Sequence, residues 1–240
     1  MRFGSGFFDL QLRFAHRVSD LSGMPLGDAL LGYTNFYIRF GLGRAFDPHH
    51  AIWIEYMDGL ARSADQTAWT VRFFATRQGL PQPSHTVATF GCFSYGHRDA
   101  GCLRLHFENA DPDGQAPLAA ERKSARRSEL RALLAHVRHA EPQATRLAGV
   151  SWLYNLASYR RLFPESYLAT AKIAGGRFRN MPLWGQFLDR HGTVRTAAAA
   201  LFLDRLARQR SMDDLVQCFP LQPLAVEAPL SDFHAFHAIA

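Results

Sequence analysis

Apolar residues near the start of the chain recur every three or four positions, the spacing of helices that bury one face. Asp9 is a candidate N-cap for the first of these helices. Pro25 begins a second helix with a wide apolar face, and Gly41 is placed to end it. A third helix begins after Asp47. The pattern therefore predicts a helical N-terminal segment over residues 1–65.

Beyond this segment, apolar and polar residues alternate, which is typical of strands with one buried face. The alternation predicts a strand over Trp69–Thr76. It also predicts an antiparallel hairpin of Thr86–Tyr95 and Cys102–Glu108, whose short connection is rich in turn residues. Helical spacing then returns and predicts a long helix over Ala119–Arg138, with an Arg-rich first half.

The next part of the chain mixes strands with short helical runs. A buried strand is predicted over Arg146–Tyr154, a short helix over Leu156–Leu162, and strands over Tyr167–Ile173 and Trp184–Leu188. Together with the hairpin and the long helix, these elements indicate a sheet core over residues 66–195.

The C-terminal part, residues 196–240, predicts helices followed by an extended tail. An apolar stripe around Phe202 indicates one helix, and Ser211 begins a short one that ends at Cys218. Three prolines then favour extended backbone. Because the chain shows no repeat, charged linker or shift in composition, we expect a single domain over residues 1–240. Its expected class is α/β (α+β), with a mixed, largely antiparallel central sheet flanked by helices.

Composition narrows the class of protein. The chain has 240 residues, of which 48% are hydrophobic and 20% charged, which favours a folded core over disorder. Its longest apolar run, Ala197–Leu203, is far shorter than the roughly 20 residues that cross a bilayer. The three cysteines stand at no metal-binding spacing and cannot all pair with one another. We therefore expect a protein that is soluble, makes no membrane contact and is located in the cytoplasm.

The formal charge of +6 arises from 27 basic and 21 acidic residues, and only Lys123 and Lys172 among the basic ones are lysines. Arginine matches carboxylates and phosphates, so this excess is compatible with an anionic small molecule or with nucleic acid. A compositional habit of the source genome would give the same excess without any function.

The residues after the strand Arg146–Tyr154 resemble a known family. They read Asn155-Leu156-Ala157-Ser158-Tyr159-Arg160-Arg161-Leu162-Phe163. This is similar to the Asn, Ala, Tyr and Phe sequence that follows the fifth strand of the GCN5-related N-acetyltransferases (GNAT), whose element order is similar over residues 66–195. The resemblance implies a GNAT-like fold, acyl-CoA as cofactor, and an acyl-CoA-dependent N-acyltransferase or a non-catalytic relative of that fold. Leu31–Pro48 and Trp184–Arg195 look like segments of bacterial proteins of unknown function, which implies no activity.

The sequence departs from the family at the loop that binds pyrophosphate. Where the family has several glycines before its long helix, this chain has Gly114 alone, accompanied by Asp111 and Asp113, which would repel phosphates. Side-chain charge at the start of the helix would have to replace the backbone donors. The candidate phosphate-binding residues are Arg122, Lys123, Arg126 and Arg127.

The resemblance also implies roles for individual residues. Tyr159 stands where the family has its Tyr, a general acid that returns a proton to the leaving thiolate. Asn155 belongs to the same motif and is implied to bind the cofactor. His106 and Glu108 end the third strand on one side, so either is a candidate base. The alternative is structural, with Tyr159 packed in the core and the other two facing solvent.

A cleft is expected near this motif. We expect the strand ending at Tyr154 to diverge from the strand Cys102–Glu108, so that Trp152 and Tyr154 bracket a slot. Unpaired backbone groups in such a slot can bond a pantetheine-like chain.

Other functions stay open. A non-catalytic binding protein would use the Arg-rich helix to contact an acidic partner, although Glu121 and Glu129 interleave with its cations. Nucleic acid is disfavoured because aromatic and basic residues are not interleaved. A lyase or hydrolase has no residue signature for or against it. No metal is expected, because adjacent histidines such as His49 and His50 on one helical turn diverge.

Overall fold

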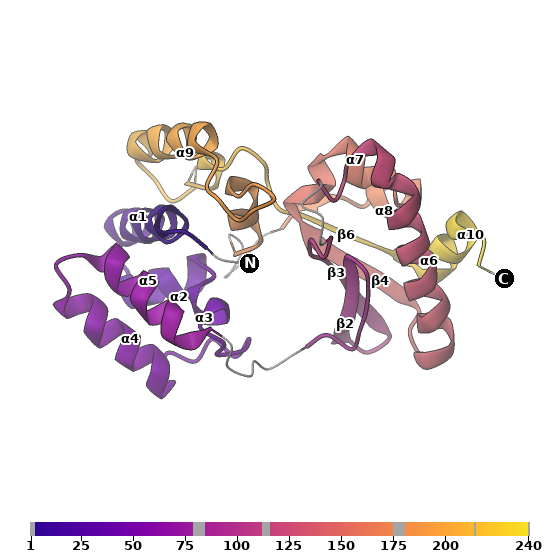
Figure 1. The fold of residues 1–240 in the computed structure, drawn as a ribbon, viewed down its shortest axis with the longest axis horizontal. Helices are drawn as coiled ribbons and strands as arrows, with labels where there is room; N and C mark the ends of the chain where they lie inside the picture. The colour runs from indigo at the N-terminus through magenta and orange to yellow at the C-terminus, as the bar shows by residue number, and fades with distance from the viewer. Residues whose placement is uncertain (1–2, 79–84, 112–115, 175–180, 214, 240) are drawn as a thin grey trace. The chain divides into compact units, whose positions relative to one another are not determined.

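A computed structural model describes residues 3–78, 85–111, 116–174, 181–213 and 215–239. The chain divides into two compact units (Figure 1). One combines Met1–Pro83 with Gly175–Gln222, and the other combines Ser84–Ala174 with Pro223–Ala240. The expected mixed α/β class is confirmed, because helices accompany a six-stranded, mostly antiparallel sheet in the described residues.

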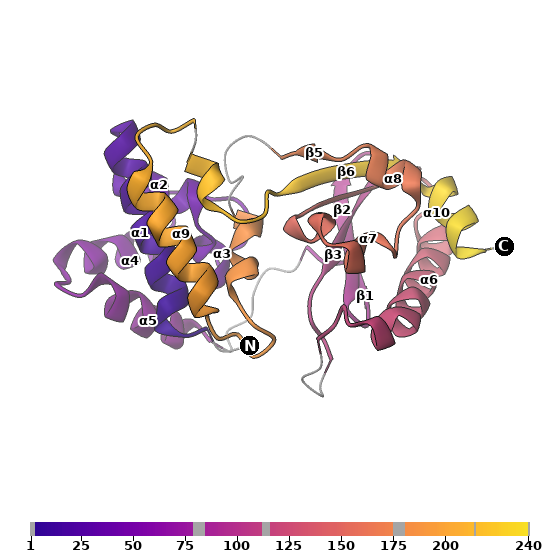
Figure 2. The same cartoon turned by 90° about the horizontal axis from the view of Figure 1, so that it is seen from above.

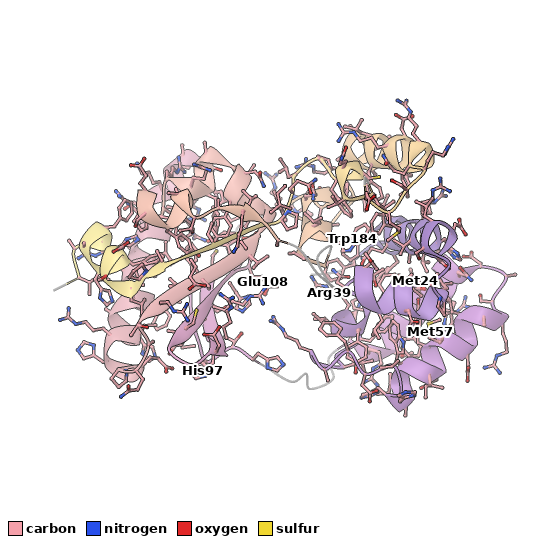
Figure 3. The ribbon with its side chains drawn as sticks, turned by 180° about the vertical axis from the view of Figure 1, so that it is seen from behind. Met24, Arg39, Met57, His97, Glu108 and Trp184 are labelled. Atoms are coloured by element: carbon pink, nitrogen blue, oxygen red, sulfur yellow. The ribbon has the colours of Figure 1, made fainter. Side chains whose placement is uncertain are left out.

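The first unit is helical and holds an aromatic core. Phe14 of the first helix packs against Trp184 and Phe219, with ring centroids 5.5 and 5.1 Å apart. Trp184, labelled in Figure 3, also donates a hydrogen bond from Nε1 to the carbonyl oxygen of Tyr33 at 3.2 Å. Its elements are α1 Ser5–Ser22, α2 Leu26–Tyr33, α3 Phe36–Arg39, α4 Ala51–Arg62, α5 Gln66–Arg77, η3 Met181–Phe187, α9 Thr196–Arg208 and η4 Leu215–Cys218.

The second expected helix is divided into α2 and α3. The break falls at Thr34 and Asn35, where the Thr34 hydroxyl donates to the Leu30 carbonyl at 2.6 Å. The side chain of Gln11, buried in α1, accepts from the Asn35 backbone at 2.9 Å. These side chains replace the helical bonds that an uninterrupted helix would make.

Two expected strands of this unit are wrong. Trp69–Thr76 lies in α5, because Asp65 caps the helix by accepting from Ala68 N at 2.8 Å, and Thr70, Phe73 and Phe74 share its buried face. These three buried residues are at helical spacing, whereas Val71 and Ala75 of the alternating set are not buried. Trp184–Leu188 is mostly a 3₁₀ helix, and Leu188 makes only an isolated bridge.

The second unit contains the sheet, in the order β1-β2-β3-β4-β6-β5 (Figure 2). The expected antiparallel hairpin is present as β2 and β3. Its predicted first strand, Thr86–Tyr95, has the wrong bounds, because a turn at Gly91 and Cys92 divides it into β1 and β2, which pair antiparallel, and β2 continues to Asp99. In contrast, β3 and β4 pair parallel, and the long helix α6 connects them in the chain. The strands are β1 Ala88–Phe90, β2 Phe93–Asp99, β3 Cys102–Phe107, β4 Arg146–Ser151, β5 Lys172–Ile173 and β6 Leu224–Pro229.

One face of this sheet forms the core of the unit. Leu130 and Leu134 of the long helix α6 belong to one buried cluster with Leu103, Leu105 and Leu147 of the sheet. On the other face, the alternate positions of β3 are polar at Arg104 and His106, whereas those of β4 include the apolar Ala148 and Val150. The helical elements are η1 Ala120–Arg122, α6 Lys123–Ala140, η2 Trp152–Asn155, α7 Ala157–Arg160, α8 Glu165–Ala169 and α10 Leu230–His237.

The segments around the last strand differ from their predictions in part. Tyr167–Ile173 is not one strand, because α8 occupies its first half and only Lys172–Ile173 pairs with β6. The backbone over Leu224–Pro229 is extended as expected, but it forms strand β6 inside the sheet, between β4 and β5, and not a tail packed along the surface. Helix α10 then follows where no helix was predicted.

Candidate functional site: a basic groove on the sheet unit

The parallel pair β3 and β4 separates before either strand ends. Their register runs from Cys102↔Arg146 to Leu105↔Gly149. Strand β3 continues to Phe107 and β4 to Ser151, so the last two residues of each lie beyond the shared ladder. The shared ladder therefore ends before either strand does, but the expected slot between Trp152 and Tyr154 is wrong. Strand β4 ends at Ser151, and both residues lie in the 3₁₀ helix η2, where Tyr154 is buried.

Tyrosine side chains lie at this point. The Tyr154 and Tyr167 hydroxyls are hydrogen-bonded at 2.8 Å. The ring of Tyr159 packs 5.1 Å from that of Tyr154 and 5.4 Å from that of Phe107. A Cβ at Gly149 would come within 2.0 Å of the Tyr154 hydroxyl, so only glycine fits beneath the tyrosines.

The candidate acid Tyr159 is part of the core. It is 2% exposed, and its hydroxyl is hydrogen-bonded to Tyr154. Burial, followed by the neighbouring Tyr154, raises the pKa of Tyr159 well above its ordinary value. The phenol therefore stays protonated, with its proton held inside the protein.

The two candidate bases are not brought together with Tyr159. Phe107 contacts the Tyr159 ring, and because strand residues alternate, the preceding His106 points to the opposite face of the sheet. Glu108 is exposed just after β3, and its backbone N–H donates to Cys92 O at 2.9 Å. Figure 3 shows it at the far end of the hairpin from His97.

Arg126 is used inside the protein. It is 2% exposed, and its Nη2 lies 2.9 Å from Asp111 Oδ1 and 3.0 Å from Glu129 Oε1. Its Nη1 contacts the Cys92 sulfur. Asp111, expected to repel phosphates, instead pairs with Arg126 and lies 3.7 Å from Arg122 Nε. The positive charge of Arg126 is therefore paired inside the protein, with Asp111 and Glu129.

Asn155 also has a local partner. It lies at the end of η2, and its side-chain amide donates to the Trp152 carbonyl oxygen at 2.8 Å. This bond stabilises the turn between β4 and α7, and the side chain is exposed.

Lys123 and Arg127 line a groove between α6 and α10 with a volume of about 460 Å³. One turn further along α6, Arg131 extends the same row of cations. The Arg127 guanidinium lies 5.4 Å from the centre of the exposed Phe236 ring. The residues that line this basic groove are Lys123, Ser124, Arg127, Ser128, Arg131, Phe236, His237 and Ala238.

Within the described ranges, no carboxylate forms an ion pair with these three cations, Lys123, Arg127 and Arg131. The first turn of α6 also contains no acidic residue and has no side-chain N-cap. Cations near a helix N-terminus oppose the helix dipole, so this arrangement costs the helix free energy that a bound anion would offset.

The groove combines expected and unexpected residues. Lys123, Arg127 and Arg131 were recognised from the sequence as an Arg-rich helix. Phe236 and His237 were missed as site residues, because nothing in their local pattern indicated that α10 packs against α6.

Comparison with family models, with curated proteins and with solved structures finds no match to this chain. In the part of the chain that the structure describes, no helix is both long enough and apolar enough to span a membrane.

Proposed function

We propose that this chain binds coenzyme A or an acyl-CoA in the basic groove of its sheet unit. The observation that carries the proposal is the row formed by Lys123, Arg127 and Arg131, which no described carboxylate neutralises. Phosphate groups suit such a row, because guanidinium and ammonium groups form charge-assisted hydrogen bonds with their oxygens.

The rest of the groove suits a nucleotide. Ser124 and Ser128 add hydroxyl donors on the same side of α6, and Phe236 offers an exposed ring against which a base can stack. A ligand with both phosphates and an aromatic base would use every kind of group that lines the groove.

The position of the groove in the chain order also supports this ligand. Helix α6 connects the parallel strands β3 and β4, whose ladder ends early at Leu105↔Gly149. In the GNAT fold that the sequence resembles, the corresponding helix begins at the phosphates of acyl-CoA. Lys123 and Arg127 are two of the residues that this resemblance assigned to phosphate binding.

Acyl transfer is a further step of the proposal and has less support than binding. The resemblance assigns the acid to Tyr159, whose hydroxyl is bonded inside the core, and His106 lies on the other face of the sheet. A non-catalytic relative of the fold, which binds the ligand through the Arg-rich helix, is the second candidate function and agrees with this burial.

Charge reversal in the groove tests the proposal. We expect acetyl-CoA to bind the intact chain with a micromolar dissociation constant at low salt, and Arg127→Glu to weaken binding at least about tenfold, because a cation becomes a repelling anion. Isothermal calorimetry measures both. Raising the salt concentration should weaken binding of the unmodified chain.

Arg62→Glu is the matched control, because it makes the same charge change at an exposed position of α4 and Arg62 does not line the groove. It should bind acetyl-CoA within about twofold of the unmodified chain, since it leaves every cation of the groove in place. Equal weakening by both substitutions would mean that net charge, not the groove, attracts the ligand. No heat with millimolar acetyl-CoA would refute the proposed function.

A further inference from the structure

One buried nitrogen of the basic groove lacks a hydrogen-bond partner. His237 is 5% exposed, and its Nε2 bonds to nothing among the described residues. The backbone of Leu162 hydrogen-bonds the ring. Because a neutral histidine carries its proton on the nitrogen that donates, this bond leaves Nε2 as a bare acceptor.

The surroundings keep this ring neutral. Burial, followed by the charge of Arg127, lowers the pKa of His237 to about 4. Arg131 adds to the effect, and Lys123 lines the same groove. The carboxylate of α10, Asp232, accepts a hydrogen bond from Ser166 at 2.6 Å and is not among the lining residues.

The groove therefore presents several cations together with one unsatisfied acceptor. A fully deprotonated anion satisfies the cations but leaves Nε2 without a donor, which costs about 1–3 kcal/mol for a buried polar group. An anion that carries its own proton satisfies both. A phosphate monoester is such an anion below its second pKa of about 6, where the monoanion keeps one proton while His237, with a pKa of about 4, stays neutral.

We propose that Nε2 of His237 accepts a hydrogen bond from a phosphate monoester held by Arg127 and Arg131. Phosphodiesters and sulfate carry no proton at neutral pH, so His237 selects against them. No covalent bond forms or breaks, and the proton lies between the phosphate oxygen and Nε2. The inference rests on the proposed function and deepens it, because it assigns the groove to the ribose phosphate of a coenzyme A ligand, and not to the pyrophosphate that the resemblance places at the start of α6.

Two exposed side chains lie beside His237. The Phe236 ring packs edge-on against the His237 ring, with 5.0 Å between the centroids, and the Arg127 guanidinium lies over Phe236.

Coenzyme A and dephospho-coenzyme A, which lacks the monoester, test the inference in calorimetric titrations of the intact chain at about pH 5.5, where the monoester keeps one proton. We expect coenzyme A to bind at least about tenfold more tightly. His237→Asn keeps an amide near the nitrogen that bonds Leu162 but removes the acceptor at Nε2, so it should lose most of this preference. His237→Gln places an amide oxygen near Nε2 and should retain more of it.

The outcomes are distinct. If both ligands bind the unmodified chain equally well, the inference fails and the proposed function stands, whereas if neither binds, the proposed function fails. An unchanged preference in a folded His237→Asn variant would also overturn the role of His237.

A competition experiment on the unmodified chain needs no variant. Inorganic phosphate should displace bound coenzyme A at about a tenth of the concentration that sulfate requires, and equal potency of the two anions would contradict the inference.

Discussion

Replacing Arg126 by alanine is expected to lower the free energy of unfolding by about 3–5 kcal/mol, although the residue resembles a ligand-binding arginine in the sequence. The side chain is 2% exposed and bonds Asp111 and Glu129. Its removal leaves two carboxylates close together in a poorly hydrated site without a cation. Denaturant unfolding of the intact chain, followed by circular dichroism, measures the loss.

Arg127→Ala provides the matched control one position along the same helix. Because Arg127 is exposed and pairs with no described carboxylate, its removal should change stability by less than about 0.5 kcal/mol. For acetyl-CoA binding the order should be reversed: Arg127→Ala should weaken binding more than Arg126→Ala does. Equal stability losses would show that Arg126 is not the centre of a buried ion-pair network.

Gly149→Ala is expected to destabilise the sheet unit by about 3 kcal/mol through overpacking. The added methyl would lie 2.0 Å from the Tyr154 hydroxyl and 2.6 Å from that of Tyr167. Both hydroxyls are held by their mutual hydrogen bond, so neither yields without losing it. The change in unfolding free energy measures this cost.

Tyr154→Phe should rescue part of the loss, because it removes the closer of the two hydroxyl oxygens. The double variant should be more stable than the sum of the single effects predicts, by at least about 1 kcal/mol. Gly27→Ala is the control, since its Cβ would meet only Met57 at an ordinary 3.5 Å. Strict additivity of Gly149→Ala and Tyr154→Phe would contradict the packing described here.

The sequence predicted β3, α6 and most of β4, because each carries a clear apolar period. Trp69–Thr76 was misassigned because its apolar residues alternate, whereas the face that the structure buries is Thr70, Phe73 and Phe74, at helical spacing after the cap at Asp65. Gly175–Gln222, the segment between β5 and β6, belongs to the same unit as the N-terminal helices. This grouping depends on contacts between distant segments, so no local sequence pattern predicts it.

The candidate site was predictable on one side only. Arg126 stands four residues before Leu130 on the apolar stripe of α6, so its inward direction could have been recognised from spacing alone. The contribution of Phe236 and His237 could not, because it depends on how α10 packs against α6.

Hydrogen exchange of the intact chain with and without acetyl-CoA tests the central claim most directly. If the basic groove binds the ligand, amides in residues 123–131 of α6 and 234–239 at the end of α10 should exchange several-fold more slowly in its presence. The buried strands β3 and β4 should change little. Protection confined to other segments, or no protection at millimolar acetyl-CoA, would contradict the assignment of this groove as the ligand site.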